Sequence, residues 1–258
     1  MTFTTTQPAV NGRAVLIAQV IALIAVLSIW EWAAASGAVS QLFIGRPSGI
    51  FKYLVENFSN GTIPYEAMWT MGATLMAFML GSAAGIACGL LFTTFPATER
   101  FFDPLFSGLN ALPRIALAPL LLLWFGLGIA SKVALGFSLT FFVVLYNTVA
   151  GARSVDRDFL ILSETLGCSG WERFLKVTLP SAIPTIFSGL KLGLISALLG
   201  VVGGEIIASE HGLGQLLTFL AGTFNTNGVF AILAVLGVIG SLLISGMTSL
   251  ERHLLRWK

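Results

Sequence analysis

The sequence predicts an all-α, polytopic membrane protein with about six transmembrane helices and both termini in the cytoplasm. Only 10% of the 258 residues are charged and 56% are hydrophobic, whereas soluble domains carry about 25% charged residues. Apolar runs of about 20 residues, long enough to cross a bilayer core, recur along the chain. Because so little polar surface is available, most of the exterior must face lipid.

Six apolar runs account for the predicted spans. They cover residues 14–35, 66–92, 105–126, 132–152, 182–208 and 228–249. With the N-terminus inside, nine Lys and Arg residues fall on the cytoplasmic side and three on the other, the bias that is usual in membrane proteins. The nine are Arg13, Arg100, Arg153, Arg157, Arg173, Lys176, Arg252, Arg256 and Lys258, and the three are Arg46, Lys52 and Lys132.

The first run also admits a second interpretation, a cleaved signal peptide. Arg13 precedes it and the small residues of 33–39 follow it, which is typical of such peptides. The run is longer than a usual signal-peptide core, however, and Glu31 between two tryptophans suits an interfacial anchor. We therefore expect a retained helix.

The segment after this run carries a second helical pattern. Apolar side chains recur at helical spacing after Pro47, at Ile50, Leu54 and Phe58. They predict a short amphipathic helix on the outer surface, with an ordinary ordered loop as the alternative. The chain thus divides into 1–65, the first transmembrane helix with an outer-surface segment, and 66–258, a five-helix core.

Glycines at every fourth position mark two of the later spans. They are Gly81, Gly85 and Gly89 in the second span and Gly189 and Gly193 in the fifth. Such spacing lets helix backbones approach each other closely. Packing within this chain's own bundle is favoured here over a contact between subunits.

A polar segment at 153–181 interrupts the apolar sequence, and its second half reads GCSGWERFLKVTLP. Residues 157–166 and 170–178 can each form a helix, with Gly167 allowing a sharp turn between them. Pro180 is expected to end the segment and to start the next transmembrane helix. Its exposed apolar and charged side chains suit docking into a partner's groove, or else a helix lying on lipid headgroups.

This segment resembles the cytoplasmic EAA loop of permease subunits of ATP-binding-cassette (ABC) importers. That loop ends with Gly, nine residues and then Ile-x-Leu-Pro; here Gly167 is followed at the same spacing by VTLP at 177–180. Residues 111–135 and 205–217 resemble the branch that imports sulfonates, taurine, nitrate and related compounds. The resemblance runs from about Phe43 to the C-terminus.

The resemblance implies a type I ABC importer permease fold, a second copy of the chain, cytoplasmic ATPase subunits and a periplasmic or extracellular substrate-binding protein. ATP and Mg would be used by the ATPase subunits, and this chain would bind no cofactor. Segments 36–65 and 209–227 are the candidates for receiving the binding protein; the alternative for 213–224 is a re-entrant or surface helix with no partner. The residues expected to couple ATPase movement to transport are Ser163, Glu164, Gly167, Cys168, Trp171, Phe174, Leu179 and Pro180.

Two departures from the family pattern concern charged positions. The Glu-Ala-Ala triplet falls on residues 161–163, where this chain has Ile-Leu-Ser, and Glu164 lies one position after the triplet. Its carboxylate could meet the same partner from a rotated direction. In the second span, Ala77 stands where the branch often has Arg.

Polar residues inside the predicted spans are candidates for lining a translocation pathway, because an unpaired charge at the bilayer centre costs about 2.5–3.5 kcal/mol. For the cations among them, snorkelling to cytoplasmic headgroups is the alternative; for Glu205, it is a cap beside the turn at 212–214. The candidates are Asn110, Arg114, Trp124, Asn147, Lys191 and Glu205.

Other classes of protein are less well supported by these residues. A stand-alone ion- or proton-coupled carrier usually shows an inverted repeat, and none is evident between 1–130 and 131–258. An enzyme is disfavoured because no phosphate-binding loop, catalytic cluster or metal spacing occurs, and no basic patch suggests nucleic acid. We therefore expect a non-catalytic, multi-pass subunit of a bacterial inner membrane that carries a small organic solute or anion: a sulfonate, taurine or nitrate, or a thiamine-precursor pyrimidine or riboflavin.

Overall fold

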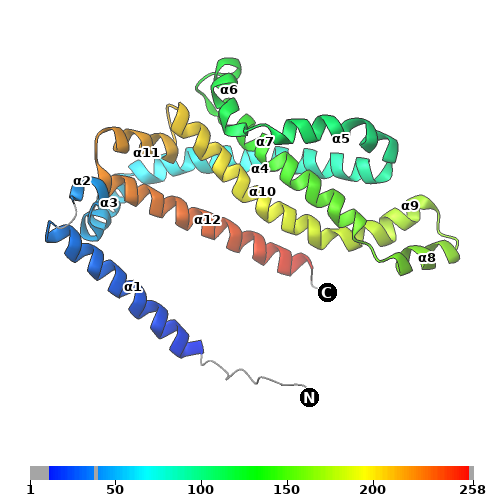
Figure 1. Ribbon diagram of the computed structural model, residues 1–258, viewed down its shortest axis with the longest axis horizontal. Helices are drawn as coiled ribbons and strands as arrows, with labels where there is room; N and C mark the ends of the chain where they lie inside the picture. The colour runs from blue at the N-terminus through cyan, green and yellow to red at the C-terminus, as the bar shows by residue number, and fades with distance from the viewer. Residues whose placement is uncertain (1–11, 38–39, 256–258) are drawn as a thin grey trace.

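The computed structural model describes residues 12–37 and 40–255, and every regular element in them is helical. Arg256 and Lys258, counted above as cytoplasmic cations, lie outside the described residues. Figure 1 shows a bundle of long helices with short helices gathered at its two ends. The helices are α1 Gly12–Ala35, α2 Gln41–Ile44, α3 Pro47–Ser59, α4 Thr62–Thr94, α5 Pro96–Ala111, η1 Arg114–Leu117, α6 Ala118–Phe125, α7 Ile129–Arg153, α8 Arg157–Thr165, α9 Gly170–Arg173, η2 Phe174–Thr178, α10 Leu179–Ile207, α11 Leu213–Gly222 and α12 Thr226–Leu254.

Five of these helical stretches are long and apolar enough to cross a membrane: α1, α4, α7, the run from α9 to α10, and α12. The prediction of a single straight span at 105–126 is wrong, because the helix is broken. Its residues belong to two helical pieces, α5 and η1–α6, that meet at 83°. Pro113 has no N–H to continue the helix and forces Leu112 into an extended conformation, with φ −67° and ψ 137°.

Three spans, α4, α7 and α10, form the centre of the bundle, and their glycines lie where the helices cross. A Cβ added at Gly81 would come within 2.7 Å of the Thr140 side chain on α7. A Cβ at Gly193 of α10 would come within 2.8 Å of Val144. Packing within the chain's own bundle is therefore confirmed for these glycines, and we call α4, α7 and α10 the central unit.

The first span, α1, runs apart from the central unit (Figure 1). Its side chains from Val15 to Ile29 are exposed within this chain, and only its end is tied down. There the Glu31 carboxylate accepts hydrogen bonds from the Ser48 amide at 3.0 Å and from the Ser48 hydroxyl at 2.8 Å. Trp30 packs edge-on against Phe230 of α12. The rest of α1 is thus available to lipid or to another chain.

The amphipathic helix predicted after α1 is confirmed as α3. Its apolar side chains Tyr53 and Leu54 pack on a buried cluster formed by Ile63, Leu213, Leu220 and Ile232. This cluster joins α3 to α4, α11 and α12, and the four meet at what we call the α11 end of the bundle (Figure 1).

The polar segment 153–181 forms the opposite end, which we call the α8 end. Two helices and a glycine turn are confirmed, and Pro180 lies in the first turn of α10, but it does not end the preceding helix as predicted. The helix runs unbroken from Gly170 to Ile207, through a π-helical turn in which Leu179 N–H donates to Phe174 C=O. Each π-helical bond spans five residues instead of four, and such turns often occur at functional positions.

We predict that Gly85→Val in α4 lowers the thermal stability of the detergent-purified protein. The new Cβ would lie 2.8 Å from the Phe141 carbonyl and 3.0 Å from Val144 Cβ, and overpacking of this kind costs about 1–3 kcal/mol. Gly72→Val, in the same helix with no atom within 4 Å of its added Cβ, is the control. Equal melting temperatures for the two variants would contradict the packing described here.

Candidate functional site

The turn between α8 and α9 depends on Gly167, whose φ is +74°. In this left-handed conformation Gly167 N–H donates to Glu164 C=O at 2.9 Å, and Cys168 N–H donates to Ser163 C=O at 3.0 Å. These bonds close the last turn of α8 in the way that glycine ends many helices. The chain then reverses, so that α9 folds back beside α8.

The short helix α9 is fixed at its start by a capping box. Ser169 Oγ accepts the Glu172 N–H at 3.3 Å, and the Glu172 carboxylate accepts the Ser169 N–H at 3.0 Å. Trp171 stacks on Phe174, with ring centroids 5.5 Å apart. Local sequence is therefore sufficient to hold this segment in one conformation.

Apolar side chains cover the exposed side of the segment. Trp171 is 63% exposed and Leu166 is 72% exposed. Four of these exposed apolar residues were not identified from the sequence, although the helical spacing in 157–166 was a usable signal. They are Phe159, Ile161, Leu162 and Leu166. Contiguous exposed apolar side chains of this kind mark interaction surfaces. We call Phe159, Ile161, Leu162, Leu166 and Trp171 the α8 apolar face.

A cleft of about 610 Å³ separates the segment from the end of the bundle. An ion pair lies on each side of it: Arg153 of α7 pairs with Glu99 of α5, and Arg173 pairs with Glu164. Glu164, proposed above as a substitute for the missing family acid, is thus bound within its own chain, although its side chain remains 64% exposed.

The other predicted coupling residues differ in exposure. Ser163 is buried and donates its hydroxyl proton to Leu160 C=O at 2.7 Å. Cys168 is half-buried in the turn, and Leu179 and Pro180 lie where α10 begins. Their role in coupling stays a prediction.

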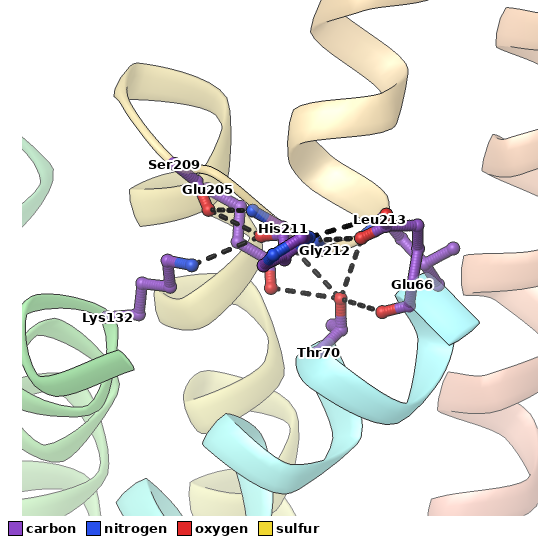
Figure 2. Close-up of polar contacts among 8 residues, drawn as sticks. All are labelled: Glu66, Thr70, Lys132, Glu205, Ser209, His211, Gly212 and Leu213. Atoms are coloured by element: carbon purple, nitrogen blue, oxygen red, sulfur yellow. Dashed lines mark hydrogen bonds and ion pairs between the residues drawn. The ribbon is translucent and has the colours of Figure 1, made fainter. Parts of the chain in front are cut away.

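At the α11 end, a polar network holds the start of α11 (Figure 2). The Thr70 hydroxyl of α4 lies 2.9 Å from Glu205 Oε1 of α10 and accepts the Leu213 N–H at 2.8 Å. Glu205 accepts the Gly214 N–H at 2.8 Å, and Glu66 accepts the Gly212 N–H at 2.5 Å. Side chains of two spans thus satisfy three amides that α11 itself leaves free.

The same network contains one buried cation and a histidine. Lys132 Nζ of α7 donates to the His211 carbonyl at 3.1 Å. The His211 ring stacks on Trp69 at 5.0 Å, and its Nδ1 lies 3.7 Å from Glu66. Glu205 is only 1% exposed within the chain, and sequence reasoning placed it beside the turn at 212–214 without identifying Glu66 and Thr70 as its companions. Whether it also lines a pathway stays a prediction.

Arg114 and Asn110, two predicted pathway residues, lie together at the break between α5 and η1. The Arg114 guanidinium donates to the Asn110 side-chain oxygen and, at 3.2 Å, to the Asn110 C=O. Its Cζ lies 4.4 Å from the ring centroid of Phe142 on α7, a distance that permits a cation–π interaction.

The remaining pathway candidates are dispersed. Lys191 of α10 pairs with Glu251 of α12, a partner sixty residues away that the sequence did not reveal. Asn147 bonds to Val143 C=O of its own helix at 2.8 Å, opposite Gly189 of α10. Trp124 is 67% exposed at the end of α6. The structure therefore joins Asn110 with Arg114 and leaves the other four apart.

Comparison with known proteins agrees with this arrangement. Residues 81–256 match the family described as binding-protein-dependent transport system inner membrane component. The chain belongs to this family. It is accordingly a permease of a binding-protein-dependent ABC importer, a non-catalytic, multi-pass subunit of the inner membrane. Such importers imply ATPase and binding-protein partners.

Relatives of the permease cover most of its length. A Bacillus subtilis permease assigned to aliphatic sulfonates transport is 32% identical over 90% of this chain and 84% of its own. The riboflavin transport permease of Chloroflexus aurantiacus is 30% identical, over 92% and 89%. The formylaminopyrimidine transport permease of Halalkalibacterium halodurans is 34% identical, over 72% and 76%.

A solved structure supports the fold of the permease. An inward-facing MetNI methionine ABC transporter chain superimposes with a TM-score of 0.64 over 72% of this chain and 94% of its own. At 18% identity, this likeness concerns the fold alone.

We predict that Thr70→Val loosens the start of α11. It leaves the Leu213 N–H without its acceptor and removes one of the two donors to Glu205, the Gly214 N–H being the other, which costs about 1–3 kcal/mol. Hydrogen exchange of the amides at 212–214 should therefore become faster. Thr148→Val is a matched control, because that buried hydroxyl bonds only to Val144 C=O of its own helix. Unchanged exchange in Thr70→Val would show that the network does not hold α11.

Proposed function

We propose that the permease works as a homodimer with two ATPase subunits, and that its α8 end faces the cytoplasm. Arg153, Arg157, Arg173 and Lys176 gather at that end, as the positive-inside rule requires of a cytoplasmic side. Both chain termini are then cytoplasmic as well. The α8 apolar face lies on the same side, where it has no core of its own to cover it.

The observation that carries the proposal is the unbroken helix from Gly170 to Ile207. The α8 apolar face docks in a groove of the ATPase, and α9 continues directly into α10. A displacement of the segment therefore moves α10, and with it α4 and α7, as one body. ATP and Mg act only in the ATPase subunits.

At the other side of the membrane, the α11 end receives the substrate-binding protein. Segments 36–65 and 209–227 contribute α2, α3 and α11, all of which pack on α12; α3 and α11 do so around one buried cluster. Residues 38–39 of the first segment lie outside the described residues. A binding protein that lands here touches the polar network that ties α11 to α4 and α10.

The transported compound is a small organic solute or anion. The relatives reported above are named for aliphatic sulfonates, riboflavin and formylaminopyrimidine. At about 30% identity, they support this broad class of transported compound but do not single out one compound. The binding protein makes the finer selection.

Reconstitution into liposomes tests the proposal against a stand-alone carrier. We expect the permease alone to transport nothing, and to transport only when the ATPase, ATP and the binding protein are supplied. Uptake by the permease alone, driven by an ion gradient, would instead identify a secondary transporter.

We predict that Gly167→Val leaves the permease folded in the membrane but lowers ATP-driven uptake about tenfold, because a side chain at positive φ costs roughly 1–2 kcal/mol. Gly167→Asn is the control, since Asn tolerates this conformation better than other residues and no atom lies within 4 Å of the added Cβ. Normal uptake by the Val variant would refute the coupling role of this turn.

A further inference from the structure

Arg114 lies beside the middle of α7, one of the helices long and apolar enough to cross a membrane. Its guanidinium contacts Phe142, which is 13 residues after the start of α7 and 11 before its end. At 1.5 Å per residue, either end of α7 is about 17–20 Å away along the helix. An arginine side chain is shorter than that, so snorkelling does not bring this charge to the headgroups.

No carboxylate pairs with Arg114 among the described residues. The other two cations within the six apolar runs predicted as spans differ in this respect. Lys191 pairs with Glu251, and Lys132 joins the network that contains Glu66 and Glu205. Arg114 is thus the one cation of those six apolar runs whose charge no acid among the described residues balances.

The donors of Arg114 are also incompletely used. A guanidinium has five N–H donors in a planar fork. Those on Nη2 bond to Asn110, whereas Nε is buried without a partner, and Nη1 has none among the described residues. Asn110 and Phe142 hold the group in place on one side. The Nη1 end of the guanidinium is left for a ligand, whereas Nε is enclosed by the chain.

The backbone around Arg114 is irregular at this depth. The chain breaks at Leu112 and Pro113, and Ile115 is 55% exposed within the chain. Non-helical backbone is tolerated inside a membrane only where protein covers it or where it lines a water-filled cavity. In a transporter, discontinuous helices of this kind carry substrate contacts.

We infer that Arg114 binds the oxyanion group of the transported solute at mid-membrane, a sulfonate or carboxylate, with Asn110 and Phe142 as positioning residues. The inference rests on the proposed function, because the anion is taken to be the cargo. A guanidinium fork matches the two oxygens of such a group. A solute that carries this group then supplies the negative charge that pairs with Arg114, which no acid among the described residues does.

Chemical protection tests the inference on the purified permease, without any need for transport. Phenylglyoxal modifies arginines, and peptide mass spectrometry gives the rate at Arg114. Ethanesulfonate at about ten times its Kd should slow this rate about tenfold, because only about a tenth of the sites are then free to react. Ethanesulfonamide, neutral and of the same size, should not. Arg100, exposed on the same chain in α5, should react equally in every sample.

Equal protection by ethanesulfonamide, or no protection by ethanesulfonate, would overturn the inference. Protection by phosphatidylglycerol alone would overturn it too, because a lipid phosphate would then be the ligand rather than a solute.

Ligand-induced stabilisation gives an independent readout. Ethanesulfonate should raise the melting temperature of the wild-type permease and of Arg100→Gln, but not of Arg114→Gln. Arg114→Lys keeps the positive charge but lacks the planar guanidinium, so ethanesulfonate should raise its melting temperature by less than that of the wild type. This second variant keeps the test valid if Arg114→Gln fails to fold. An equal rise in all four proteins would contradict the inference. If Arg114 is protected but the chain transports without ATPases, the anion contact stands and the importer function falls.

Discussion

The structure depends on the close approach of α4, α7 and α10, which glycine makes possible. Gly85 admits the backbone of α7, and Gly200 brings α10 against Gly136 of α7. In lipid, helices associate through packing and interhelical hydrogen bonds because apolar burial gives no advantage there. Thr140 adds such a bond, from its hydroxyl to Gly193 C=O at 3.1 Å. The three spans therefore behave as one body, to which everything else is attached.

Both ends of the molecule connect rigidly to this central unit. At the α8 end, the connection is covalent and helical, since α9 continues into α10 through a π-helical turn. At the α11 end it is polar, through Thr70 and Glu205. An event at one end can thus reach the other without a flexible joint. Arg114 lies between the two ends, beside the middle of α7, at a break that belongs to neither.

Much of this was predictable from the sequence, and the exceptions have physical reasons. Hydropathy located the five long spans, and Gly167 with the VTLP motif located the two short helices and the turn of the 153–181 segment, because both signals are local. The Leu112–Pro113 break was missed because composition alone does not distinguish a straight span from a bent pair. The continuity of α9 with α10 was missed because Pro180 suggested an interruption, whereas it lies in the first turn of α10, directly after the π-helical turn. The partners of Lys191 and Glu205 depend on helix crossings, which one sequence does not reveal.

The most direct measurement is a purification of the tagged chain from its native membrane in mild detergents, with mass spectrometry of whatever accompanies it. A permease moved through its α8 end must bind an ATPase strongly enough to be driven by it. We expect a stoichiometric companion that carries a phosphate-binding loop, and its loss when the α8 apolar face is made polar by Leu162→Glu and Leu166→Glu. Recovery of the chain alone in every detergent would contradict the account.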